Sequence, residues 1–242
     1  MKKILPFIII LAVLGVALGS AWYMQRSASQ STKPSVAGVA GNSANAGNTA
    51  TSPSAPATVA ANAVPGAEPA HKLGPDSAPV HLEEFGDFQC PPCGLFHPIL
   101  EEMKRQFGDQ LQITFREFPL APAHQHAIAA ASAAEAAGLQ GKFWEMHDLL
   151  YEHQKDWKDE FDVRPTFEGY AKQIGINLDR YKQDVDGDQV GKRITQDGNR
   201  GHSLGVKGTP TVFLNGREVP FESLPADKLK VLIQVELTSP SR

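Results

Sequence analysis

Residues 84–93, Glu84-Phe85-Gly86-Asp87-Phe88-Gln89-Cys90-Pro91-Pro92-Cys93, contain the only two cysteines of the chain. The residues before them alternate in polarity from Pro79 to Gly86, which predicts a strand. Cys90 has the place of a helix N-cap, and Pro91 suits the first helical position, where a missing N–H costs little. Two thiols at this spacing, between a strand and a helix, are typical of a dithiol that closes and reopens a disulfide.

Zinc sites also use cysteine pairs at this spacing. A tetrahedral zinc site normally needs a second pair of Cys or His ligands, and the chain has no further cysteine. His124 and His126, two residues apart, make a poor metal site by themselves. We therefore predict a redox dithiol, no metal, and no cofactor beyond the Cys90–Cys93 disulfide.

The N-terminal part of the chain predicts a membrane anchor. Lys2 and Lys3 precede an apolar run from Ile4 to Met24, close to the roughly 20 residues of a bilayer-spanning helix. We favour an inner-membrane anchor in residues 1–26 over a cleaved signal peptide, whose apolar stretch is usually shorter. In both cases the positive end stays in the cytoplasm. The rest of the chain is then periplasmic or otherwise extracytoplasmic, where disulfide chemistry is at home.

Composition divides the remaining chain into a linker and a domain. Residues 27–70 consist almost entirely of Ala, Ser, Gly, Asn, Thr, Pro and Val, so they lack the apolar content that offsets the entropy of ordering. We predict a disordered tether there and one folded domain in residues 71–242. The net charge of −4, with no basic run in the domain, argues against a nucleic-acid partner.

The order of elements in the domain predicts an α/β fold. A helix after Cys90 and a second alternating strand, residues 111–118, complete a parallel βαβ unit. Several helices follow in an insertion at about residues 122–204. Two short strands then flank Asn215-Gly216, a strong hairpin signal, and a final amphipathic helix covers residues 222–237. This order predicts a thioredoxin-like fold, a central mixed sheet flanked by helices, with an inserted helical subdomain.

At these motifs the sequence resembles the DsbA-like thioredoxin-fold disulfide oxidoreductases of the bacterial periplasm. The matching stretches are residues 84–93 and Gly205-Val206-Lys207-Gly208-Thr209-Pro210-Thr211, and residues 141–150 are similar to the inserted helical segment of the family. The resemblance covers most of residues 75–238. It implies that Pro210 is a cis-proline facing the dithiol. It also implies that Thr209 offers its backbone to an extended substrate peptide.

The residues of the dithiol loop suggest a division of roles. Cys90 is the expected nucleophile, because the helix dipole and free amides at an N-cap favour the thiolate. Cys93, one turn into the helix, is the expected resolving cysteine. Pro91 and Pro92, assigned with Thr209 to the substrate-binding side, remove two amide donors and leave the Cys93 amide to reach the Cys90 sulfur. Strong oxidants of the family usually carry His where Pro92 stands, so we predict an intermediate reduction potential.

Glu84 is the expected proton acceptor for Cys93. It lies six residues before Cys90 on the apolar face of the strand, and burial there raises the pKa of a carboxyl. The resembled family has an acidic residue at the same offset. The alternative is an exposed Glu84 beside Glu83. Of the nearby histidines, we predict His97 to be exposed and His147 to be packed in the core.

Three functions remain open. We favour a membrane-tethered thiol–disulfide oxidoreductase that donates its disulfide to cysteine-containing exported proteins and is recycled by a membrane redox partner; the resemblance implies a quinone-linked oxidase. The second is a reductase or isomerase that a membrane electron donor keeps reduced. Residues 27–70 offer no dimerisation module, which makes the isomerase less favoured. The third is a non-catalytic peptide-binding module.

Overall fold

The computed structural model describes residues 63–121 and 123–238, which lie within one compact unit, residues 53–242. The predicted anchor and most of the predicted linker fall outside the described residues. Within the described ranges, no helix has both the length and the apolar character that a membrane span requires.

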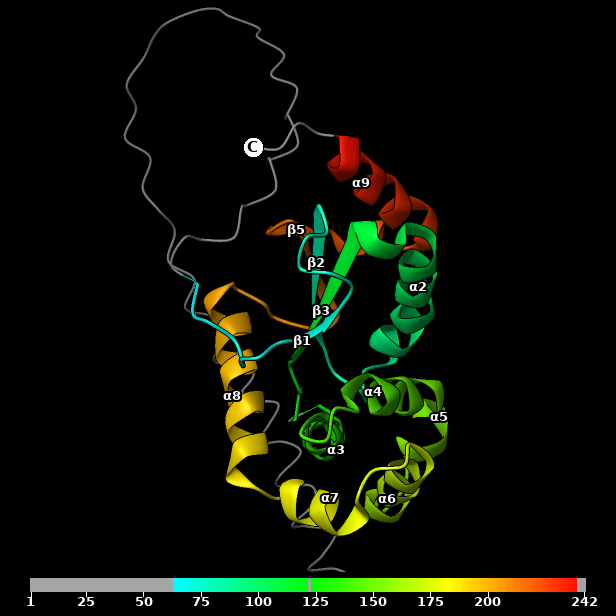
Figure 1. Ribbon diagram of the computed structural model, residues 1–242, viewed down its shortest axis with the longest axis vertical. Helices are drawn as coiled ribbons and strands as arrows, with labels where there is room; N and C mark the ends of the chain where they lie inside the picture. Colours follow the sequence, from blue (N-terminus) through cyan, green and yellow to red (C-terminus); the bar gives the residue numbers. More distant parts are fainter. Residues whose placement is uncertain (1–62, 122, 239–242) are drawn as a thin grey trace, which may run out of the picture. The chain divides into compact units, whose positions relative to one another are not determined.

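The described residues contain a mixed five-stranded sheet with strand order β1-β3-β2-β4-β5 (Figure 1). Only β2 and β3 pair in parallel, and α2 connects them, which confirms the predicted βαβ unit. In the turn between β4 and β5, Asn215 and Gly216 both have positive φ, 46° and 75°, as the predicted Asn-Gly hairpin requires. The strands are β1 (His71–Leu73), β2 (Val80–Gly86), β3 (Leu111–Glu117), β4 (Thr211–Leu214) and β5 (Arg217–Val219).

A block of helices is inserted between β3 and β4, as predicted. It is visible in Figure 1 as the green-to-orange helices between those strands in the sequence colouring. The helices of the fold are α2 (Pro91–Phe107), α3 (Ala127–Gly138), α4 (Phe143–Glu152), α5 (Gln154–Trp157), α6 (Arg164–Gln173), α7 (Leu178–Asp184), α8 (Asp188–Ser203) and α9 (Ala226–Thr238). The short strand β1 and the helix α5 were not predicted, because neither is long enough to show periodicity.

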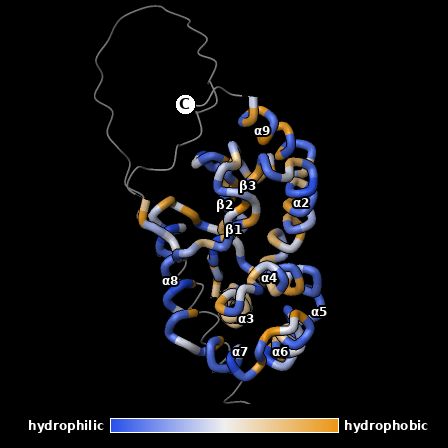
Figure 2. The backbone as a smooth tube through the Cα atoms, in the orientation of Figure 1, coloured by the Kyte–Doolittle hydropathy of each residue, from blue (hydrophilic) through white to orange (hydrophobic). Residues whose placement is uncertain are grey.

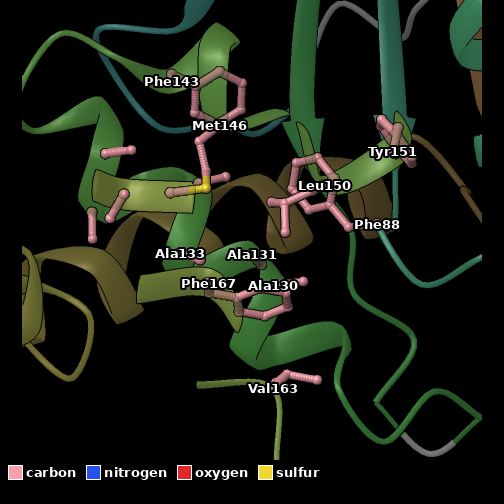
Figure 3. Close-up of a cluster of buried hydrophobic side chains, with 14 of the residues drawn as sticks. Phe88, Ala130, Ala131, Ala133, Phe143, Met146, Leu150, Tyr151, Val163 and Phe167 are labelled. Carbon is pink, nitrogen blue, oxygen red and sulfur yellow. The ribbon is translucent and has the colours of Figure 1, made fainter. Parts of the chain in front are cut away.

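The two faces of the sheet carry different helices. On one face, alternate residues of β2 and β3 pack against α2 and α9 in a core that includes Leu82, Ile113 and Leu229. Further along the same face, Phe115 joins the buried cluster of the helical insertion, part of which Figure 3 shows. The opposite face packs Phe85 and Phe213 beside the end of α8. Figure 2 shows α8 as largely hydrophilic, so this helix meets the sheet through polar groups as well.

Residues 64–70 are packed against the domain, so the prediction that the disordered linker reaches residue 70 is wrong for them. Ala67 is fully buried. Its N–H donates to Asp197 Oδ1 at 2.7 Å, and its carbonyl accepts from Arg116 Nη1 at 2.8 Å. Arg193 donates to the Pro69 carbonyl at 3.0 Å. The composition of residues 64–70 did not predict this packing, because the segment binds through its backbone. The backbone supplies hydrogen-bond partners for buried charged groups of the domain.

Candidate active site

The dithiol lies where β2 leads into α2. Cys90 is the N-cap of α2 with extended backbone, and Cys93 lies in the first helical turn with no exposed surface. Both are free thiols. The predicted helix start is confirmed, including Pro91 at the first helical position. Leu95, two residues after Cys93, is an apolar side chain that is 71% exposed.

The Gly208-Thr209-Pro210 loop faces this dithiol across the sheet end. The Cys90 thiol donates to the Thr209 carbonyl at 3.3 Å. The Thr209–Pro210 peptide bond is cis, as the family resemblance implied. Residues more than a hundred positions apart in the sequence are thus brought together as predicted. The Thr209 carbonyl is a backbone acceptor beside the Cys90 sulfur.

The surroundings of Cys90 favour its thiolate. Hydrogen bonding from the Cys93 thiol, the Thr209 hydroxyl and the Cys93 amide lowers the pKa of Cys90 to about 6, against the opposing effects of burial and of Asp87. The Thr209 hydroxyl is buried and has no hydrogen-bond partner among the described residues, so it is free to donate to a thiolate at Cys90.

Cys93 and Glu84 are both held neutral. Burial, followed by the neighbouring Cys90 and Glu84, raises the pKa of the Cys93 thiol well above its usual value. Burial, followed by the charge of Cys90, raises the pKa of Glu84 to about 8. Glu84 is 1% exposed, so the alternative of an exposed Glu84 is wrong. A carboxyl with a pKa of about 8 is partly ionised near neutral pH, and its carboxylate form can take a proton from Cys93.

The helical insertion holds the dithiol loop through two glutamines that sequence reasoning missed. Gln154 Nε2 donates to the carbonyls of Phe88 and Cys90 at 2.7 and 2.9 Å. Gln89 Nε2 donates to the Lys158 carbonyl at 2.7 Å. These bonds fix the backbone on both sides of the nucleophile. The only signal in the sequence was the position of Gln89 beside Cys90, since nothing local marks Gln154 as its neighbour.

His97, predicted to be exposed, is buried and 8% exposed. Its Nε2 bonds Asp148 Oδ1 at 3.2 Å, and His147 Nδ1 bonds the same oxygen at 2.9 Å. The carboxylate that covers His97 comes from the insertion, which is why the local sequence did not indicate burial. His147 is a packed core histidine, as predicted, and burial lowers its pKa to about 4. These three side chains have the types and spacing of a metal site. The shared carboxylate oxygen bonds one nitrogen of each imidazole, while Nε2 of His147 is buried without a hydrogen-bond partner among the described residues.

A family model described as Thioredoxin matches residues 67–234, well over half of the 242 residues. The chain therefore belongs to the thioredoxin family. Its structural neighbours are DsbA-like thiol–disulfide oxidoreductases, which confirms both the fold and the family that the motifs indicated.

Three solved structures illustrate this likeness. BdbD from Bacillus subtilis, in its oxidised form, is 26% identical to this chain, with a TM-score of 0.64. The match covers 73% of this chain and 97% of BdbD. A thioredoxin-like oxidoreductase from Silicibacter pomeroyi is 23% identical with a TM-score of 0.59, over 71% and 94% of the two chains. The thiol–disulfide exchange protein α-DsbA2 from Wolbachia pipientis is 19% identical with a TM-score of 0.56, over 67% and 87%. The last two matches support the fold alone.

The curated relatives carry a different name. A Na⁺/H⁺ antiporter NhaA 1 from Salinispora arenicola is 42% identical over 148 residues, which are 61% of this chain and 22% of the antiporter. An antiporter NhaA from Herminiimonas arsenicoxydans is 32% identical over 149 residues, 62% and 23% of the two chains. The chain thus spans less than a quarter of these relatives, and the likeness concerns one part of each.

Proposed function

We propose that this protein is a membrane-tethered, extracytoplasmic thiol–disulfide oxidoreductase that donates its Cys90–Cys93 disulfide to exported proteins. A substrate thiolate attacks the Cys90 sulfur and displaces the Cys93 sulfur, which takes up a proton. A second substrate thiolate then attacks the mixed disulfide, forms the substrate disulfide and leaves Cys90 as a thiolate. A membrane redox partner reoxidises the dithiol. The redox-active disulfide is the only redox group in this cycle.

The geometry of the dithiol is the observation that carries the proposal. Cys90 is the N-cap of α2, and its thiol lies 3.3 Å from the Thr209 carbonyl, next to the cis peptide bond of Pro210. This setting lowers the pKa of Cys90. A stable thiolate stabilises the reduced form and makes the disulfide a better oxidant, while the missing histidine at Pro92 keeps the expected strength intermediate.

Extracytoplasmic location and tethering rest on the sequence of residues 1–26 and on the need of disulfide donation for an oxidising compartment. The match to part of two antiporters, which are membrane proteins by name, supports a membrane setting for a domain of this kind. Ion transport itself is not proposed for this chain, because the chain spans less than a quarter of those relatives.

The reduction potential of the full-length protein, equilibrated in glutathione buffers, tests the direction of transfer. We expect a value between those of thioredoxin, about −270 mV, and DsbA, about −120 mV, on the oxidising side of the glutathione couple. Oxidation of a reduced model peptide with two cysteines should stop in the Cys90→Ser variant. A potential near that of thioredoxin would contradict disulfide donation and favour the reductase. Unchanged biological activity of Cys90→Ser would favour the non-catalytic peptide-binding module.

A further inference from the structure

Buried polar groups that the proposed reaction does not use lie near the dithiol. Both carboxyl oxygens of Glu117 and the hydroxyl of Tyr151 are buried and have no hydrogen-bond partner among the described residues. Nearly all buried polar atoms in proteins are bonded, and an exception calls for an explanation such as a catalytic role. An unpaired buried carboxyl has a large energetic cost, so a structural role does not account for Glu117.

The pairing of β2 and β3 places these groups beside Glu84. Glu84 is opposite Phe115, and Gly86 is opposite Glu117. Because side chains alternate along a strand, Glu84, Gly86 and Glu117 face the same side of the sheet. A Cβ atom on Gly86 would lie 3.0 Å from the Tyr151 hydroxyl. The same Cβ atom would lie even closer to Cε2 of Phe115, so the Phe115 ring and the phenol share the space above Gly86, on the side of the sheet that Glu84 and Glu117 face.

The charges around Tyr151 connect the dithiol with Glu117. Burial raises the pKa of Tyr151 well above its usual value, and the charges of Cys93, Glu84, Glu117 and Asp87 raise it further. The phenol is thus within electrostatic reach of the resolving cysteine and of all three carboxyl groups. Figure 3 shows Tyr151 and Phe88 among the buried side chains of this region. The rings of His97 and His147 also pack against Tyr151, with ring centroids 5.4 and 5.0 Å away.

The surroundings of Glu117 favour its protonated form. Burial raises its pKa well above the usual value, and the nearby carboxylates of Glu135, Asp197 and Asp87 act in the same direction, while Arg193 opposes them. A protonated carboxyl has one donor and one acceptor oxygen. It can therefore accept a proton on one oxygen while it releases the proton of the other, without adding a second buried charge.

We propose that Tyr151 and Glu117 extend Glu84 into a buried proton relay that serves Cys93, an inference that rests on the proposed oxidoreductase function. When Cys93 resolves a mixed disulfide, its S–H proton passes to the Glu84 carboxylate. The Cys93 thiolate attacks the Cys90 sulfur, the Cys90–Cys93 bond forms, and the bond to the substrate sulfur breaks with the electron pair on the leaving thiolate. Glu84 then gives its proton to the Tyr151 oxygen as Tyr151 donates its own toward Glu117.

Asp87 provides the exit for the proton. Its Oδ2 bonds His124 Nδ1 at 2.8 Å, and the His124 side chain is 20% exposed. The proton that Glu117 releases passes through Asp87 to His124 and then to solvent. Bridging water completes the hydrogen bonds of the relay in this proposal. Each turnover thus returns Glu84 to its carboxylate form without exposing Glu84 itself.

Single-turnover oxidation by glutathione tests the relay. The reduced full-length protein is mixed with excess oxidised glutathione and quenched with acid, and mass spectrometry follows the Cys90–glutathione adduct and the Cys90–Cys93 disulfide. We expect Glu117→Gln and Tyr151→Phe each to slow the loss of the adduct by roughly tenfold, less than the 10²–10⁴ of a direct acid–base group, and to flatten its pH dependence. Formation of the adduct by Cys90 should not change.

The Glu84→Gln background decides whether the three groups form one path. There we expect neither Glu117→Gln nor Tyr151→Phe to slow resolution further. Glu83→Gln is the matched control, a carboxyl on the opposite face of β2, and should leave the pH profile of resolution unchanged. Resolution at the wild-type rate in both relay variants, or equal slowing with and without Glu84, would overturn the relay. If the wild-type protein does not form the adduct at all, the proposed function fails instead.

Discussion

Two neighbouring carboxyl groups on β2 lie in opposite surroundings. Glu83 accepts from Arg200 Nε at 2.7 Å and from Arg116 Nε at 2.9 Å. Burial acts to raise its pKa, but these two guanidinium groups outweigh burial and lower it. Glu84, the next residue, faces the dithiol. There burial and the charge of Cys90 act together and raise the pKa to about 8.

The comparison shows that nearby charged groups, more than burial, determine whether the pKa of a carboxyl group is lowered or raised. On the face of the sheet that Glu83 faces, arginines and carboxylates from β3 and α8 neutralise each other. They also join residues 64–70 to the sheet. On the Glu84 face, no arginine or lysine is among the causes of the raised pKa. The first face stabilises the fold, while the second holds groups that can exchange protons.

The largest expected effect is a loss of stability when one member of the ion pairs around Glu83 and Arg116 is removed. Asp197→Ala takes away the acceptor of Arg116 and of two backbone N–H groups, those of Ala67 and Glu117. We expect a loss of about 3–5 kcal/mol in the free energy of unfolding, because Arg116 loses its most deeply buried partner and two backbone N–H groups lose their acceptor. Urea denaturation measures this. Asp186→Ala is the control, since its exposed pair with Arg164 should contribute at most about 1 kcal/mol. Equal losses in the two variants would contradict the distinction between buried and exposed pairs.

Neutralising Glu84 should have the opposite effect and raise the free energy of unfolding. The folded pKa of Glu84 is raised to about 8 from its ordinary value of 4.5. Its contribution to stability is therefore fully present below pH 4.5 and is lost as pH rises through about 8. We expect Glu84→Gln to be more stable than the wild type by roughly 3 kcal/mol at pH 7, with a much smaller gain at pH 4.5. Urea titrations of the reduced protein at several pH values measure the gain. A gain that does not depend on pH would show that Glu84 is not buried in its neutral form.

The smallest expected effect distinguishes the two causes of the raised pKa of Glu84, which are burial and the charge of the Cys90 thiolate. Cys90→Ala removes the thiolate that adds to the raised pKa of Glu84, whereas burial, the larger cause, remains. We expect the pKa of Glu84 to fall but to stay well above the ordinary value of a glutamate. Carbon-13 NMR of the labelled side-chain carboxyl measures it. A return to the ordinary value would mean that the thiolate, and not burial, sets the difference between Glu83 and Glu84.

The alternation of β2 was enough to predict that Glu83 and Glu84 face opposite sides, because the two-residue period of a strand is local. The sequence could not show that Arg116 and Arg200 reach Glu83, since those contacts depend on how β3 and α8 pack. His97 was mispredicted for the same reason, because Asp148 approaches it from the insertion. The dithiol, the cis-proline loop and the fold were predictable because short motifs encode them. Gln154, Tyr151 and Glu117 carried no motif.

Residues 64–70 give the domain a mechanical property. Val64 exchanges hydrogen bonds with Ser203 and Arg200, Ala67 with Asp197 and Arg116, and Pro69 accepts from Arg193. A force applied at Val64 would therefore act first on these hydrogen bonds and on the buried ion pair of Arg116 with Asp197. Arg116 and Glu84 face opposite sides of the sheet, so the contacts that such a force breaks first are not those that surround the reactive sulfurs.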